Sequence, residues 1–129
     1  TLLEFEPEVY RRVMSEETAD TLAKLLQKTP REGTARRYFA HRRAFPNDVT
    51  VGGKTGTLSE KRPYLGFTWF VGFGSHDNLR TKDAAVAGLV CNTPKWRIKG
   101  AYAASEGLRK YFDVVEERAG SDGRLASSE

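Results

Sequence analysis

Three apolar segments separated by short polar turns constrain the fold of this chain more than any other feature. They span residues 49–58, 66–74 and 84–92; the first begins with alternating β-branched residues, and the second is rich in aromatic rings. Strands joined by short polar loops typically pair with their neighbours in an antiparallel meander. The third segment is apolar along its whole length, which is typical of a strand that is buried on both faces.

Amphipathic helices are expected before these strands. Residues 15–27 place leucines and alanines on one face at helical spacing, and Ser15 is a suitable N-cap. Pro30 is expected to break this helix. Thr34 would then cap a short second helix over residues 34–43.

A longer amphipathic pattern closes the chain. Residues 101–119 place apolar side chains on one side and are expected to lie across the sheet as a helix. Residues 120–129 are polar and are expected to be a disordered tail. The sequence therefore predicts an α+β fold in one domain over residues 1–119: a three-stranded antiparallel sheet with N-terminal helices and a long C-terminal helix packed on it.

The bulk composition excludes several classes of protein. A chain of 129 residues with 39% hydrophobic and 29% charged residues fits one ordinary domain. Its most apolar run, residues 65–73, is much shorter than the ~20 residues of a membrane-spanning helix. Two histidines and one cysteine lie far apart and indicate no metal site. The single cysteine, Cys91, forms no internal disulfide and is expected to be buried in its apolar strand.

Basic and aromatic residues alternate over residues 35–45, as they do on some nucleic-acid-binding surfaces. The net charge is only +4, and the basic pairs are spread along the chain. We therefore expect an amphipathic helix here, with arginines outward and rings inward, and no nucleic-acid partner.

The first predicted strand carries an unusual cluster of polar residues. Residues 50–59 read TVGGKTGTLS, with Lys54 between glycines and hydroxyls. A phosphate-binding loop of the form G-x-x-x-x-G-K-[ST] would need a glycine at position 48 and a helix after the lysine. Position 48 is Asp48, and the residues that follow the lysine do not read as a helix, so we do not expect a phosphate loop.

The order Lys-Thr-Gly is also found in serine acyl-transfer enzymes that bind penicillin. A cation beside a hydroxyl, here Lys54 and Thr55, can hold the carboxylate that ends a peptide substrate. Gly56 would leave clearance for the substrate, and the N–H of Thr57 would donate to the reacting carbonyl oxygen. A strand with a solvated lysine and a glycine at a bulge explains the same residues, so the triad alone leaves both interpretations open.

The wider sequence resembles the C-terminal part of the transpeptidase domain of penicillin-binding proteins, over most of the chain. VMSEETADTLAKLLQ resembles a helix of that domain, and Gly33-Thr34-Ala35 the Gly-Thr-Ala step that follows it. VGGKTGTL resembles its active-site strand, GFTWFVGF and AAVAGLVCNTP the next two strands, and AYAASEGLRKYF its closing helix. The order and spacing of these segments are far more specific than the triad.

This resemblance implies a serine D,D-transpeptidase or carboxypeptidase that acts on cell-wall peptides outside the cytoplasmic membrane. Its ligands would be peptidoglycan stem peptides and β-lactams, and nothing implies a cofactor. Lys54, Thr55, Gly56 and Thr57 would bind the substrate. Lys54 and the oxyanion N–H of Thr57 would also take part in catalysis.

Two further motifs of that family, Ser-x-x-Lys and Ser-x-Asn, are missing from this sequence, and no Tyr-x-Asn replaces the second. We therefore expect a piece of a longer protein that begins after both motifs, in agreement with the start at Thr1, and that is inactive alone. The alternative is a non-catalytic binding or interaction module that keeps only the Lys-Thr-Gly strand. As a piece, the chain is expected to self-associate through an exposed strand at 84–92.

Overall fold

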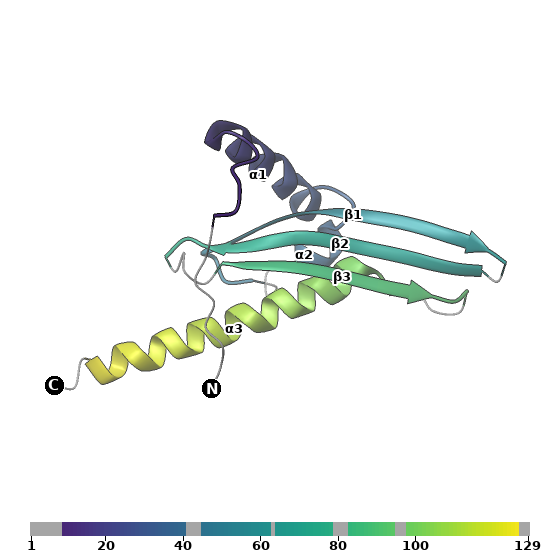
Figure 1. The fold of residues 1–129 in the computed structure, drawn as a ribbon. Helices are drawn as coiled ribbons and strands as arrows, with labels where there is room; N and C mark the ends of the chain where they lie inside the picture. Colours follow the sequence, from purple (N-terminus) through teal and green to yellow (C-terminus); the bar gives the residue numbers. More distant parts are fainter. Residues whose placement is uncertain (1–8, 41–44, 63, 79–82, 95–97, 127–129) are drawn as a thin grey trace.

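The computed structural model of this chain describes residues 9–40, 45–62, 64–78, 83–94 and 98–126, with side chains up to Gly120. Within these ranges a sheet of three strands lies between helices (Figure 1). The elements are α1 (Glu16–Arg31), α2 (Arg36–Phe39), β1 (Val49–Lys61), β2 (Tyr64–His76), β3 (Ala84–Asn92) and α3 (Gly100–Ala126). The predicted α+β class, with a three-stranded antiparallel sheet and helices at both ends, is confirmed.

The sheet is a simple meander in the order β1-β2-β3, with both pairs antiparallel. Phe70, at the centre of β2, pairs with Thr55 on one side and with Gly88 on the other. β1 and β2 extend further than the sequence predicts, and their last pair is Lys61 with Tyr64. Backbone pairing continues through this polar hairpin because exposed polar side chains do not oppose it. The hairpin end projects beyond the helices (Figure 1).

The core lies between the sheet and α3. Phe70 and Phe112 are fully buried, and alternate residues of β2 face the helix. The apolar side of α3 is set by residues at helical spacing: Ala101, Ala104, Leu108 and Phe112. Phe39 of α2 lies against Phe70 with ring centroids 4.8 Å apart and joins the short helix to the same core.

The opposite face of the sheet is only partly covered. α1 packs on β1, where Leu26 lies near Gly52 (Figure 1). Farther along this face Leu58, Val71 and Leu89 are each more than half exposed. The sheet therefore has one buried face and one largely open face.

This arrangement corrects two predictions about the third strand. β3 is not buried on both faces, because α3 covers only one of them, and exposure alternates along the strand. Cys91 is exposed rather than buried, since its side chain lies on the open face. β3 also has no neighbour on its outer side among the described residues, so it is an edge of the sheet.

The helix boundaries differ from the predicted ones in three places. Ser15 caps α1 as expected, but the helix continues through the buried Pro30, which in the last turn removes only one hydrogen bond. The second helix begins after Ala35 rather than Thr34, and residues 41–43 of the predicted helix lie outside the described residues. α3 continues past Ala119 to Ala126, because glycines weaken a helix without ending it.

Candidate functional site: the free edge of β1

β1 is the other edge of the sheet, and alternate residues direct their backbone groups toward it. The Val71 carbonyl oxygen lies against Gly53, and the Gly52 carbonyl oxygen lies against Gly72. Both carbonyls therefore point between the strands, which makes Gly52–Phe73 and Lys54–Val71 the hydrogen-bonded pairs of the ladder.

The residues between those pairs have the opposite orientation. Because backbone direction alternates along a strand, Gly53, Thr55 and Thr57 direct their N–H and C=O groups outward, to the free edge. The N–H that the sequence predicts as an oxyanion donor, that of Thr57, is thus on the accessible side of the strand.

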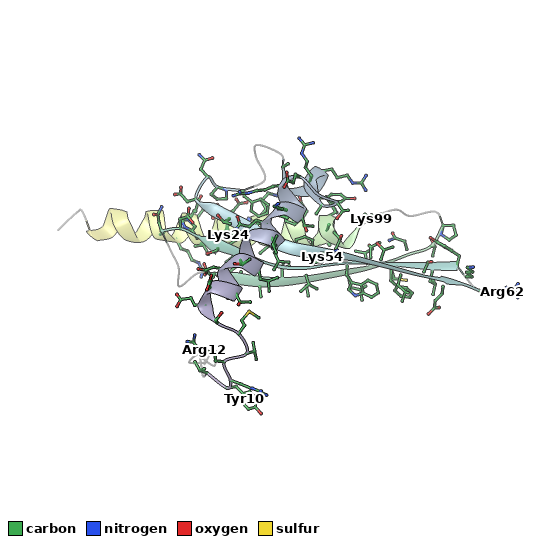
Figure 2. The ribbon with its side chains drawn as sticks, turned by 90° about the horizontal axis from the view of Figure 1, so that it is seen from above. Tyr10, Arg12, Lys24, Lys54, Arg62 and Lys99 are labelled. Atoms are coloured by element: carbon green, nitrogen blue, oxygen red, sulfur yellow. The ribbon has the colours of Figure 1, made fainter. Side chains whose placement is uncertain are left out.

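The Lys54 side chain leaves the strand on the open face of the sheet and is exposed (Figure 2). Its ammonium donates to the carbonyl oxygen of Thr55 over 3.0 Å. Since that carbonyl points outward, the cation is held at the same free edge as the outward N–H groups. The side chains of Lys54 and Thr55 leave the strand on opposite faces of the sheet. The Lys54 ammonium nevertheless lies at the free edge, because it bonds to the Thr55 carbonyl oxygen there.

The Thr55 hydroxyl is positioned from the opposite side by a distant residue. Its oxygen lies 2.8 Å from the hydroxyl oxygen of Thr34, in the link between α1 and α2. The sequence assigns Thr34 to helix capping, but α2 has no side-chain cap, and the Thr34 hydroxyl contacts Thr55 instead. A hydroxyl both donates and accepts, so this pair keeps further bonding capacity for a ligand.

The Gly33-Thr34-Ala35 step fits this role residue by residue. The Gly33 N–H donates to the Lys28 carbonyl, and a methyl group at Gly33 would lie 3.0 Å from the Thr29 Cα. Ala35 is completely buried. The step is therefore folded tightly against the end of α1, which holds the Thr34 hydroxyl in place.

Gly56 and Gly53 differ in what surrounds them. A methyl group on Gly56 would meet Trp69 at an ordinary contact distance of 3.6 Å, so packing does not require glycine there. A methyl group on Gly53 would overlap the Phe70 ring and lie 2.7 Å from the Val71 carbonyl oxygen. Gly53 is needed by the core, whereas Gly56 leaves open space at the candidate site.

Two pockets that share Thr57, Thr68 and Lys99 lie on the α3 side of the sheet. The smaller, about 190 Å³, includes Thr55, Gly56 and Thr57, and the larger, about 620 Å³, extends toward the β1–β2 hairpin. Both include Lys99, which immediately precedes α3. Lys54 lines neither pocket.

The structure thus brings together most of the predicted site residues and adds others. Thr55, Gly56 and Thr57 share the smaller pocket, while Lys54 joins them only through its ammonium at the edge. Sequence reasoning missed the contact made by Thr34, although the Gly-Thr-Ala step was a signal for it. It also missed Lys99, for which no local pattern gives a signal.

Comparisons with known proteins add no relative: no protein-family model, curated protein or solved structure matches the chain. Within the described ranges, no group of three or more metal-ligating side chains is close enough to hold a metal ion. No helix among the described residues combines the length and the apolar character needed to cross a membrane.

Proposed function

We propose that this chain is the C-terminal portion of a penicillin-binding D,D-transpeptidase domain and carries its substrate-binding edge strand. The observation that supports this most is the convergence at the free edge of β1. There the Lys54 ammonium lies 3.0 Å from the Thr55 carbonyl oxygen, the Thr34 hydroxyl bonds Thr55, and the Thr57 N–H is directed outward.

The proposed mode of binding is the addition of a strand. An extended peptide would lie along the edge and bond to the outward backbone groups of Gly53, Thr55 and Thr57. Its terminal carboxylate would be held by the Lys54 ammonium and the Thr55 hydroxyl through charge-assisted hydrogen bonds. The open space at Gly56 would let the peptide approach the strand closely.

The proposed chemistry is acyl transfer to a serine that lies upstream of this chain in the parent protein. The serine oxygen would form a bond to the substrate carbonyl carbon, the carbon–nitrogen bond would break, and the serine proton would pass to the leaving amine. The Thr57 N–H would stabilise the negative oxygen that forms on that carbonyl. The parent would work outside the cytoplasmic membrane, as the resemblance implies.

The second candidate is a non-catalytic module that binds peptides along the same edge. The absence of Ser-x-x-Lys and Ser-x-Asn from the sequence favours it, because no residue pair here has the spacing of the nucleophile and its base. In this case the edge strand would bind a carboxylate-terminated peptide without any chemical reaction.

A labelled penicillin distinguishes the two functions. The proposal predicts that the parent protein forms one covalent adduct, mapped by peptide mass spectrometry to a serine upstream of Thr1. The chain alone is expected to form none, since no other feature replaces a missing nucleophile. An encoding gene whose start codon immediately precedes Thr1, or an adduct on any serine of this chain, would contradict the proposal.

A further inference from the structure

A half-buried lysine, Lys99, lies on the α3 side of the candidate strand. Lys99 borders both pockets described above, which also share Thr57 and Thr68. Among the residues that the structure describes, no carboxylate pairs with its ammonium. A partly desolvated cation in a pocket favours an anion from outside the chain.

The backbone around Lys99 is fixed from both sides. The Asn92 side chain donates to the carbonyl of Ile98 over 2.7 Å, and the Gly100 N–H donates to the Thr68 hydroxyl over 2.9 Å. Gly100 also packs so closely against backbone carbonyls that a methyl group there would overlap Thr68. The first N–H of α3 is therefore already hydrogen-bonded within the chain. The group that remains to bind a ligand here is the Lys99 ammonium.

The rest of the smaller pocket has the character of an anion site. Arg37 lines this pocket. Its guanidinium lies 4.7 Å from the centre of the Tyr38 ring and donates a hydrogen bond to the Tyr38 hydroxyl. The Thr34, Thr55 and Thr57 side chains add hydroxyl donors. Of the described residues that line the two pockets, none is acidic.

We infer that this pocket binds a carboxylate and that Lys99 is a substrate-positioning cation on the side of β1 opposite Lys54. The ligand is a peptide whose terminal carboxylate would lie at the Thr55 hydroxyl between the two cations, with Lys54 at the free edge and Lys99 on the α3 side of β1. The larger pocket is left for the residues attached to that carboxylate. The identity of the peptide rests on the proposed function, but the anion site stands on its own geometry. Arg37, held by Tyr38, contributes positive charge at the far end.

The test is a titration of the full chain followed by amide chemical shifts. The probes are an N-acetylated dipeptide with a free C-terminal carboxylate, the same dipeptide as its C-terminal amide, and sodium acetate. The free carboxylate is expected to shift the amides of Thr55, Thr57 and Gly100, and the amide form is not. Acetate should bind more weakly, because it cannot use the larger pocket; equal affinity for acetate would overturn the assignment to a peptide.

Variants assign the effect to Lys99. Lys99→Gln should weaken carboxylate binding about tenfold, the value of roughly one charge-assisted contact. Lys99→Arg should retain most of it, and Lys110→Gln, an exposed lysine on α3 that lines neither pocket, should leave it unchanged. Unaltered carboxylate affinity in Lys99→Gln would contradict the inference. Equal binding of the free-carboxylate and amide dipeptides to the wild-type chain would also contradict it, and this comparison does not depend on the folding of a variant.

These outcomes separate the inference from the proposed function. Failure of the parent protein to form a penicillin adduct, together with Lys99-dependent carboxylate binding, would remove the function and keep the anion site. A penicillin adduct on the parent protein, together with carboxylate binding that is independent of Lys99, would support the function and remove the anion site at Lys99.

Discussion

The hydroxyl oxygens of Thr34 and Thr55 lie 2.8 Å apart, although the two residues are separated by 21 positions in the sequence. This contact joins the link between α1 and α2 to the middle of the edge strand. It fixes the direction of the Thr55 hydroxyl before any ligand arrives, and pre-orientation of this kind lowers the entropy that binding must overcome. The contact therefore connects the fold of the helices to the candidate site.

Replacement of Thr34 by valine tests this connection. Thr34→Val keeps the shape of the side chain and removes the bond to Thr55, so we expect the free energy of unfolding to fall by about 1 kcal/mol. The same variant in the parent protein should slow acylation by β-lactams, because the Thr55 hydroxyl is no longer oriented.

Thr21→Val provides the matched control. Thr21 is also exposed, and its hydroxyl bonds only within α1, to the Glu17 carbonyl. The Thr21→Val substitution in the parent protein should leave the rate of acylation by β-lactams unchanged. If Thr34→Val and Thr21→Val gave the same acylation rate, the contact would have no part in the site.

Two glycines of β1 should respond in opposite ways to alanine. Gly53→Ala should destabilise the fold by roughly 1–3 kcal/mol, since its methyl group would overlap the Phe70 ring. Gly56→Ala should change stability little, because its methyl group meets Trp69 at an ordinary distance, but it should obstruct a peptide at the edge. Urea unfolding of both variants measures the first effect, and carboxylate-peptide titration measures the second. A Gly56→Ala variant that loses as much stability as Gly53→Ala would show that packing, rather than ligand access, requires that glycine.

The third prediction concerns the outer edge of β3. The β1–β2 ladder places the hydrogen-bonded pairs of β2 and β3 at Phe70–Gly88 and its alternate neighbours, so Ala85, Ala87 and Leu89 direct their backbone groups outward. This edge carries no charge, and beside it the sheet face is apolar and exposed. Edges of this kind promote pairing between chains. We expect the isolated chain to self-associate.

Sedimentation over a range of concentrations measures this. Ala87→Lys places a charge on the edge and should shift the chain toward monomer, whereas Ala103→Lys, at an exposed position of α3, should not. A strictly monomeric wild-type chain at high micromolar concentration, with slow amide exchange along 84–92, would contradict the prediction and mean that this edge is covered within the chain.

The sequence was sufficient for the parts of the fold that local patterns determine. An alternating run, an aromatic run and a continuous apolar run predict the three strands, and the short polar turns predict their antiparallel order, because these signals depend only on neighbouring residues. Exposure of Cys91 could not be predicted, since an apolar strand looks the same whether one or both of its faces are covered.

The residues of the candidate site also differ in whether local sequence patterns could identify them. The Lys-Thr-Gly order identifies Lys54, Thr55, Gly56 and Thr57 because these residues are adjacent in sequence. Lys99 reaches them only through the packing of α3 under the sheet, where the bond from the Gly100 N–H to Thr68 sets its position. Tertiary contacts of this kind leave no periodic trace in the sequence.

We propose that the free edge of β1 holds the substrate of an acyl-transfer reaction through Lys54. The most direct measurement is the rate of acylation of the parent protein by a labelled penicillin, for the wild type, for Lys54→Ala and for Lys61→Ala, an exposed lysine at the far end of the same strand. We predict that Lys54→Ala lowers the rate by ~10²–10³, the usual effect of losing one charge-assisted contact that strengthens in the transition state, while thermal unfolding stays close to that of the wild type. Lys61→Ala should acylate at the wild-type rate. Unchanged acylation kinetics in the Lys54→Ala protein would contradict this role of Lys54.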